Sequence, residues 1–180
     1  EVYGLGLKSE RPNRIFHWQE IKYSEYLKID KPTYYGVDWG VVDPMGIIEV
    51  KYYDRALYIH ELNYKSENQL KADLTPTQKA QIDNNTQEGF IMWVFRLLGI
   101  DMSRPVICDN NRPMKIIALR KSGFDYAVAT SKGKGSIIDG IDNLNNLKVY
   151  YTHTSTNLKY EQENYSRKVD KRTGEVLEEP

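Results

Sequence analysis

The sequence has few of the residues that build disulfide frameworks, zinc sites or membrane spans. Cys108 is the only cysteine among 180 residues, which excludes an internal disulfide and a multi-cysteine zinc site and favours a structural thiol. The three histidines are widely spaced and form no HxxxH pair. No apolar run reaches the ~18 residues needed to span a bilayer, and no signal peptide opens the chain. We therefore expect a soluble domain from a reducing compartment, with no membrane partner.

The chain also lacks an excess of charge of either sign. Lys and Arg together number 25, and Asp and Glu together number 25. Binding of a polyanion through bulk charge needs a strong positive excess, so any contact with nucleic acid must come from a local patch. Hydrophobic residues make up 40% of the chain, which argues against disorder and suffices for the core of one domain.

Both ends read as internal sequence. The chain begins with Glu1 instead of Met, and its last residues stop within a predicted strand and loop. We therefore expect a piece of a longer protein. Residues 1–32 are mixed and polar and predict an arm or linker, which leaves 33–180 as the domain.

Hydrophobic periodicity predicts an α/β domain. Three strands come first, and the tight turn Asp54-Arg55 joins the second and third in an antiparallel hairpin. Strands and helices then alternate, which implies parallel pairing with helices on both faces of a mixed sheet. The expected elements are strands 34–38, 46–53 and 56–64, helix 75–98, strand 105–109, helix 113–121, strand 124–129, helix 134–146, strand 147–151, helix 154–164 and a C-terminal hairpin over 165–178.

Two aspartates end predicted strands. Asp38 follows Val37, and Asp109 follows the apolar run that ends at Cys108. If the two strands are neighbours, both carboxylates project from one edge of the sheet and can bind the same divalent cation, for which Mg²⁺ fits better than zinc. The alternative for each aspartate alone is a helix N-cap or a turn. Asp43 lies in an Asp-Pro turn and is a candidate only for the outer shell of the metal.

Positive charge concentrates in one part of the chain. Between positions 110 and 135, basic residues exceed acidic ones by five. The loop over 132–136 is glycine-rich, carries two lysines and leads into a predicted helix N-terminus, which suits contact with phosphate. A solvated basic face is the alternative. The candidates for DNA binding are Arg112, Lys115, Lys132 and Lys134.

An ordered set of segments resembles the nuclease domain of the phage terminase large subunit. The set begins with Tyr35-Gly36-Val37-Asp38-Trp39-Gly40 and Asp43-Pro44, and it continues with Leu57 to Leu62, Cys108-Asp109-Asn110-Asn111, Pro113-Met114-Lys115, Lys132 to Ile137, Ile141 to Tyr151, Asn164-Tyr165 and Asp170 to Gly174. It covers nearly the whole chain in the same order as in that family.

The resemblance implies a ribonuclease H-like fold and endonucleolytic cutting of concatemeric double-stranded DNA. Two Mg²⁺ or Mn²⁺ ions would be held by Asp38, Asp109 and a third acidic motif that would follow Pro180. Asp38 would bridge both ions and Asp109 would hold one. The implied partners are a preceding ATPase domain, the small terminase subunit and the capsid portal, and the implied location is the host cell cytoplasm.

Two other functions fit parts of the sequence. Residues 36–40 loosely match the phosphate-binding hairpin that opens actin-like and sugar-kinase ATP-binding domains, although a second glycine-rich phosphate loop is missing. A non-catalytic docking module is the other alternative, in which the aspartates form turns and the basic face binds a partner.

Overall fold

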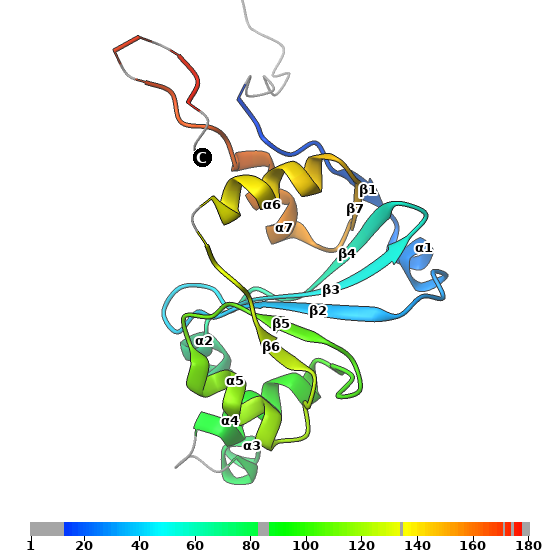
Figure 1. The fold of residues 1–180 in the computed structure, drawn as a ribbon. Helices are drawn as coiled ribbons and strands as arrows, with labels where there is room; N and C mark the ends of the chain where they lie inside the picture. The colour runs from blue at the N-terminus through cyan, green and yellow to red at the C-terminus, as the bar shows by residue number, and fades with distance from the viewer. Residues whose placement is uncertain (1–12, 83–86, 134, 171, 174, 178–180) are drawn as a thin grey trace, which may run out of the picture.

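The computed structural model describes residues 13–82, 87–133, 135–170, 172, 173 and 175–177, and it shows an α/β domain (Figure 1). Seven strands of these residues form one mixed sheet in the order β1-β7-β4-β3-β2-β5-β6. β3 is antiparallel to β2 and to β4, and the other pairs are parallel, which confirms the expected mixed sheet. The elements are β1 Gln19–Ile21, α1 Tyr23–Leu27, β2 Thr33–Asp38, β3 Gly46–Tyr53, β4 Ala56–Asn63, α2 Glu67–Ala72, α3 Pro76–Gln81, α4 Gln87–Leu97, β5 Val106–Cys108, α5 Pro113–Lys121, β6 Ala127–Ala129, α6 Ser136–Asn145, β7 Lys148–Thr152 and α7 Thr156–Asn164.

Helices cover both faces of the sheet, as the alternation predicts. Helices α2 to α5 pack below the sheet in Figure 1, and α6 and α7 lie above it. Alternate residues of the central strands point into the lower layer, where the main hydrophobic core forms. On β2 and β5 these are Tyr35, Val37, Val106 and Cys108, all buried. The intervening residues of the same strands therefore point to the upper face.

The single helix predicted over 75–98 is wrong. Thr75 caps α3 as expected, because its Oγ1 accepts a hydrogen bond from the Gln78 amide at 3.2 Å. The helix ends at Gln81, and the next residue, Ile82, has an extended backbone and its side chain in the core. α4 then begins as a separate helix, and the capped helix α2, which the sequence analysis did not include, precedes both.

Residues that were expected to form an arm contribute to the sheet. β1 lies within 1–32 and adds a parallel edge strand to β7, with Glu20 opposite Tyr151. The main chain continues this contact, because the His153 amide donates to the Ile21 carbonyl at 2.8 Å. The predicted hairpin over 165–178 is reduced to one antiparallel bridge among its described residues, between Val169 and Val176.

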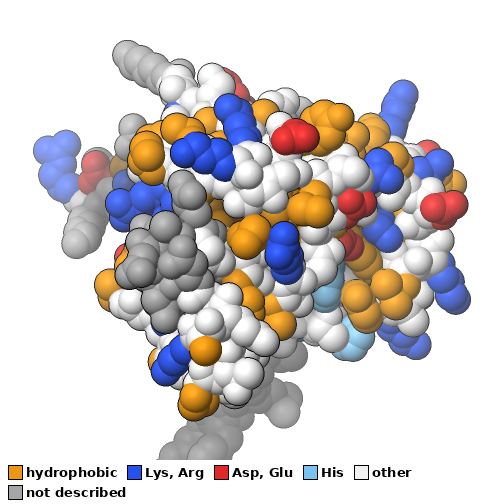
Figure 2. Space-filling view, turned by 90° about the horizontal axis from the view of Figure 1, so that it is seen from below, with side chains coloured by type: hydrophobic (Ala, Val, Ile, Leu, Met, Phe, Trp, Pro, Cys, Tyr) orange, Lys and Arg blue, Asp and Glu red, His pale blue; other side chains and the backbone are white. Residues whose placement is uncertain are grey.

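The face formed by the lower helical layer carries side chains of several kinds. Figure 2 shows hydrophobic, basic and uncharged side chains mixed on it, with Lys and Arg distributed across the surface. No helix within the described ranges is long and apolar enough to cross a membrane. This face therefore carries a mixture of hydrophobic and polar side chains. The candidate functional residues lie elsewhere, at the ends of the central strands.

His60 on β4 is expected to make stability depend on pH. Its ring lies 4.6 Å from that of Tyr23, its Nδ1 lies 2.8 Å from the Thr152 hydroxyl, and burial lowers its pKa below 6.5 although Glu49 and Glu61 oppose this. The unfolded chain therefore binds the proton more readily, so the free energy of unfolding falls as pH drops below about 6.5, until the folded pKa is passed.

The measurement for this prediction is the melting temperature at about pH 7.5 and about pH 5.5, on either side of the ordinary histidine pKa. The melting temperature of the wild type should fall more between these two pH values than that of His60→Gln, because the glutamine amide cannot gain a proton. Equal losses in the two proteins would contradict it.

Candidate functional site

Asp38 and Asp109 lie side by side at one edge of the sheet. β2 and β5 are parallel neighbours in which Val37 is opposite Cys108, so each aspartate directly follows a paired residue. The Asp109 amide donates to the Val37 carbonyl at 2.8 Å, which extends the pairing by one step. Neighbouring strands are about 4.7–4.9 Å apart, so the aspartates start from backbone positions at about this spacing.

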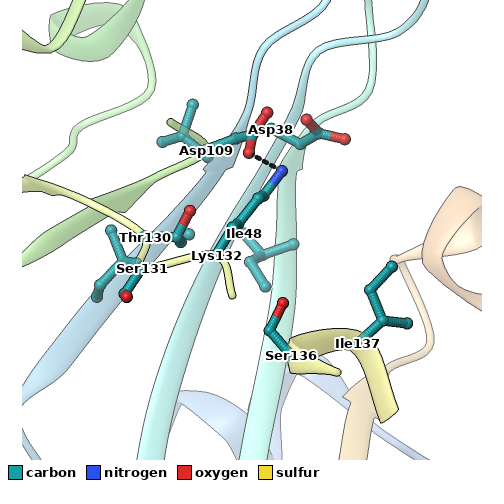
Figure 3. Close-up of a pocket in the computed structure, with 12 residues that line it drawn as sticks. Asp38, Ile48, Asp109, Thr130, Ser131, Lys132, Ser136 and Ile137 are labelled. Atoms are coloured by element: carbon teal, nitrogen blue, oxygen red, sulfur yellow. Dashed lines mark ion pairs between the residues drawn. The ribbon is translucent and has the colours of Figure 1, made fainter. Parts of the chain in front are cut away.

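Both carboxylates belong to a cleft on the upper face of the sheet. Val37 and Cys108 point into the lower core, and the aspartates that follow them reach the opposite side. Figure 3 shows the cleft between these strand ends and the start of α6. It has a volume of about 580 Å³ and is lined by Gly36, Val37, Asp38, Gly46, Ile48, Ile107, Asp109, Thr130, Ser131, Lys132, Ser136 and Ile137.

The charges in the cleft act on one another. Burial raises the pKa of Asp38, and the negative charge of Asp109 raises it further. Lys132 acts in the opposite direction and also forms an ion pair with Oδ1 of Asp109, drawn as a dashed line in Figure 3. Two carboxylates that repel each other in a partly buried cleft gain stability from a shared cation. The donor set therefore fits a hard divalent ion such as Mg²⁺ or Mn²⁺.

The segment after Asp38 fixes the position of Asp109. The indole Nε1 of Trp39 donates to the Asp109 carbonyl at 3.1 Å, and the Trp39 ring is buried in the core. Gly40 makes a close turn, because a Cβ there would lie 2.2 Å from the carbonyl oxygens of Asp43 and Pro44. The Gly40 carbonyl accepts from the Glu67 amide at 3.3 Å. The turn thus connects the strand ends that carry Asp38 and Asp109 to α2.

Lys115 is buried, which argues against the prediction that it binds DNA. Its side chain is 7% exposed and forms an ion pair with Glu67, whose side chain is 0% exposed. Its Nζ also lies 5.1 Å from the centroid of the Trp39 ring, a cation–π contact. Lys115 and Glu67 therefore support Trp39 from below, and Lys115 has no free charge to offer to a phosphate.

The other candidates occupy different positions around the site. Arg112 is exposed at the N-terminus of α5, and it lines a second cavity of about 480 Å³ together with Val41 and Asn111. Asp43 is exposed in the turn after β2 and is not among the residues that line the cleft. Lys134 lies outside the described residues.

The structure bears on the alternative assignments of two residues. The N-cap of α5 is Arg112, so Asp109 does not cap that helix. Cys108 is fully buried and burial raises its pKa to about 12, which confirms a structural thiol. Asp109 is thus left as a strand-end carboxylate that faces the cleft.

The hydroxyl side chains of Thr130 and Ser131 also line the cleft, and neither residue was predicted from the sequence to belong to the site. Thr130 directly follows β6, the strand beside β5, and its amide donates to the Cys108 carbonyl at 2.8 Å. Its buried Oγ1 makes no hydrogen bond within the described part of the chain. The sequence could have indicated Thr130 through its position at the end of predicted strand 124–129, because a residue at that position reaches the same edge of the sheet as Asp109.

Among the residues that the structure describes, no group of three or more His, Cys, Asp or Glu side chains comes together to hold a metal. The site formed by these residues has two carboxylates, one ammonium and nearby hydroxyls. The third acidic motif expected from the family resemblance is not among the residues described.

The comparisons with known proteins support the fold. No protein-family profile and no curated protein sequence matches the chain. Among solved structures, the large-terminase nuclease domain of bacteriophage SPP1, crystallised with bound Mn, matches with a TM-score of 0.67 and 20% identity over 93% of this chain and 88% of that chain.

The large terminase of a thermophilic bacteriophage matches with a TM-score of 0.57 and 15% identity over 91% of this chain. The present chain spans 39% of that protein. At these identities the likeness establishes the architecture. The chain has the ribonuclease H-like fold of the nuclease domains of large terminases, and the resemblance seen in the sequence is confirmed at that level.

Proposed function

We propose that the chain is the metal-dependent DNA endonuclease domain of a viral genome-packaging terminase. The observation that carries the proposal is the meeting of Asp38 and Asp109 at adjacent strand ends, in a cleft of a terminase-nuclease fold. The proposed substrate is concatemeric double-stranded DNA. The proposed partners are an ATPase domain in the same protein, the small terminase subunit and the capsid portal, and the proposed location is the host cytoplasm.

The proposed reaction is hydrolysis of a phosphodiester. Two Mg²⁺ or Mn²⁺ ions, when bound, supply an activated water and stabilise the leaving oxygen. Asp38, the last residue of β2, would help to hold both ions, and Asp109, directly after β5, would hold one of them. The third acidic ligand inferred from the resemblance completes the set. A place for Asp43 in the outer shell stays a prediction, because its side chain lies outside the cleft lining.

DNA is proposed to enter along the cleft with its backbone toward the carboxylates. Lys132 lies at the site, exposed Arg112 lies three residues beyond Asp109, and Lys134 is retained from the sequence. Ser136 begins α6 at the rim of the cleft, where amide groups of a helix N-terminus favour phosphate. Contacts of this kind orient the backbone without reading bases, so we expect cutting with little sequence preference.

Metal binding by the chain itself tests the proposal without cleavage. We expect Mn²⁺ to raise the melting temperature of the wild type, since a ligand that binds only the folded state stabilises it. Asp38→Asn and Asp109→Asn should each weaken Mn²⁺ binding at least about tenfold in calorimetric titration, which corresponds to about 1.4 kcal/mol.

Asp54→Asn is the matched control for metal binding. It makes the same chemical change in the turn at the opposite end of β3, where Asp54 has a φ of 49° that Asn also tolerates. The control should bind Mn²⁺ like wild type. If the two site variants bind Mn²⁺ as tightly as wild type, the metal site is wrongly assigned.

A further inference from the structure

Lys132 pairs with a carboxylate that belongs to the proposed metal site. Its side chain is 56% exposed, whereas the side chain of Asp109, its ion-pair partner, is only 12% exposed. In Figure 3 the lysine extends along the cleft and its ammonium pairs with the carboxylate of Asp109. A metal ion ligated by Oδ1 of Asp109 would meet the ammonium, which contacts the same oxygen.

The same ammonium acts on both aspartates. It contacts Asp109, and its positive charge favours the ionised form of Asp38. The ammonium therefore offsets part of the negative charge of the two carboxylates. A divalent cation shared by them would have the same effect with twice the charge. Because the ammonium contacts Oδ1 of Asp109, a metal ion that binds the same oxygen would have to displace it.

The exposure of Lys132 permits its side chain to leave the carboxylate, because 56% of the side chain is open to solvent. The residue lies in the segment between β6 and α6, outside helix and strand. A lysine ammonium on a flexible four-carbon stem can move between partners at small cost when it is largely exposed.

A released Lys132 has an anion-binding environment beside it. The N-terminus of α6 begins at Ser136, four positions further along the chain, and Ser136 lines the same cleft. A DNA phosphate seated there would lie within the range of both the helix amides and the ammonium.

We propose that Lys132 is an internal cation that occupies the Asp109 carboxylate until a divalent metal displaces it, and that the displaced ammonium then binds the DNA phosphate at the start of α6. This inference rests on the proposed function and adds an order of events to it, in which metal binding comes before the contact between Lys132 and the DNA phosphate. Metal loading and DNA binding are positively coupled through one side chain, because the metal frees the group that the phosphate uses.

The test uses Lys132→Met, which keeps the length of the stem and removes the charge. Calorimetric titration with Mn²⁺ in the absence of DNA should show binding about 3–10-fold tighter than in wild type, because the competing ammonium is gone. Anisotropy of a labelled duplex, with Ca²⁺ in place of Mn²⁺ to prevent cutting, should show that wild type binds DNA more tightly with the ion. In Lys132→Met, most of this increase in DNA affinity on adding Ca²⁺ should be lost.

Lys148→Met is the matched control, since Lys148 is an exposed lysine on β7, three strands away from β2 in the sheet. It should leave Mn²⁺ affinity unchanged and should keep the dependence of DNA binding on the ion. Lys132→Arg, which retains a positive charge, should behave like wild type in both measurements.

The outcomes separate this inference from the proposed function. If wild type binds Mn²⁺ and Lys132→Met binds it equally or more weakly, the displacement of Lys132 is wrong and the metal site stands. If wild type, Lys132→Met and Asp38→Asn all fail to bind Mn²⁺, both the metal site and the displacement are overturned.

Discussion

Asp38→Asn is expected to reduce Mn²⁺-dependent cutting of plasmid DNA by about 10²–10³-fold in the full-length protein. The amide keeps the size of the side chain but removes the charge that the metal ions require, and metal ions contribute several kcal/mol to stabilising a phosphoryl transition state. Asp109→Asn should have a comparable effect, because it removes the carboxylate at the neighbouring strand end.

The double variant Asp38→Asn/Asp109→Asn should lose little more than either single variant, since ligands that act as a unit are not additive. The rate of loss of supercoiled plasmid is the quantity to measure, with Asp54→Asn as the control that retains activity. Undiminished cutting by Asp38→Asn would show that the reaction takes place elsewhere in the protein.

Glu67→Ala is expected to lower the free energy of unfolding by about 3–5 kcal/mol. The change leaves Lys115 as an uncompensated charge in a nearly dry environment, where its side chain is only 7% exposed. The burial that lowers the pKa of Lys115 acts in the same direction, because it already disfavours the charged form. Equilibrium unfolding in urea measures the effect.

The exposed pair Lys65–Asp73 provides the matched control. Its atoms are 2.8 Å apart, and its side chains are 61% and 58% exposed. Lys65→Ala should therefore cost less than about 1 kcal/mol. The double change Lys115→Met/Glu67→Leu should recover much of the stability lost by Glu67→Ala, because both charges are then absent. Similar losses for Glu67→Ala and Lys65→Ala would mean that the buried pair does not support the fold.

The two strand-end aspartates could be predicted because their signal is local. A short apolar run followed by Asp identifies a residue at a sheet edge, and the structure places Asp38 and Asp109 there on adjacent strands. The general alternation of strands and helices likewise follows from periodicity over a few residues. These features need no knowledge of distant contacts.

Lys115 could not be placed from the sequence because its environment is formed by distant residues. It lies in a basic stretch of chain, and its local pattern is typical of a solvated face. Its partner Glu67 is 48 positions away and sits on a helix that the periodicity did not indicate. The environment of Lys115 also includes a third segment of the chain, because its ammonium makes a cation–π contact with Trp39. Tertiary packing thus reverses the exposure that local charge suggested.

The helix break at Ile82 has the same kind of cause. The sequence from Thr75 onward satisfies the rules for a helix start, and Phe90 and Val94 continue with helical spacing. The structure nevertheless ends α3 at Gln81, and Ile82 enters the core. Competition between helix propagation and burial of one apolar side chain depends on the shape of the core, which the local sequence does not reveal.

The adjacency of β2 and β5 also bears on how the protein folds. The paired residues Tyr35 and Val106 are roughly 70 positions apart, and the β3–β4 hairpin and three helices lie between them. Contacts of such long sequence separation form slowly, because the chain entropy lost in closing the loop precedes the gain from the contact. The carboxylates therefore come together only when the centre of the sheet has assembled, and a partly folded chain emerging from the ribosome lacks the paired carboxylates.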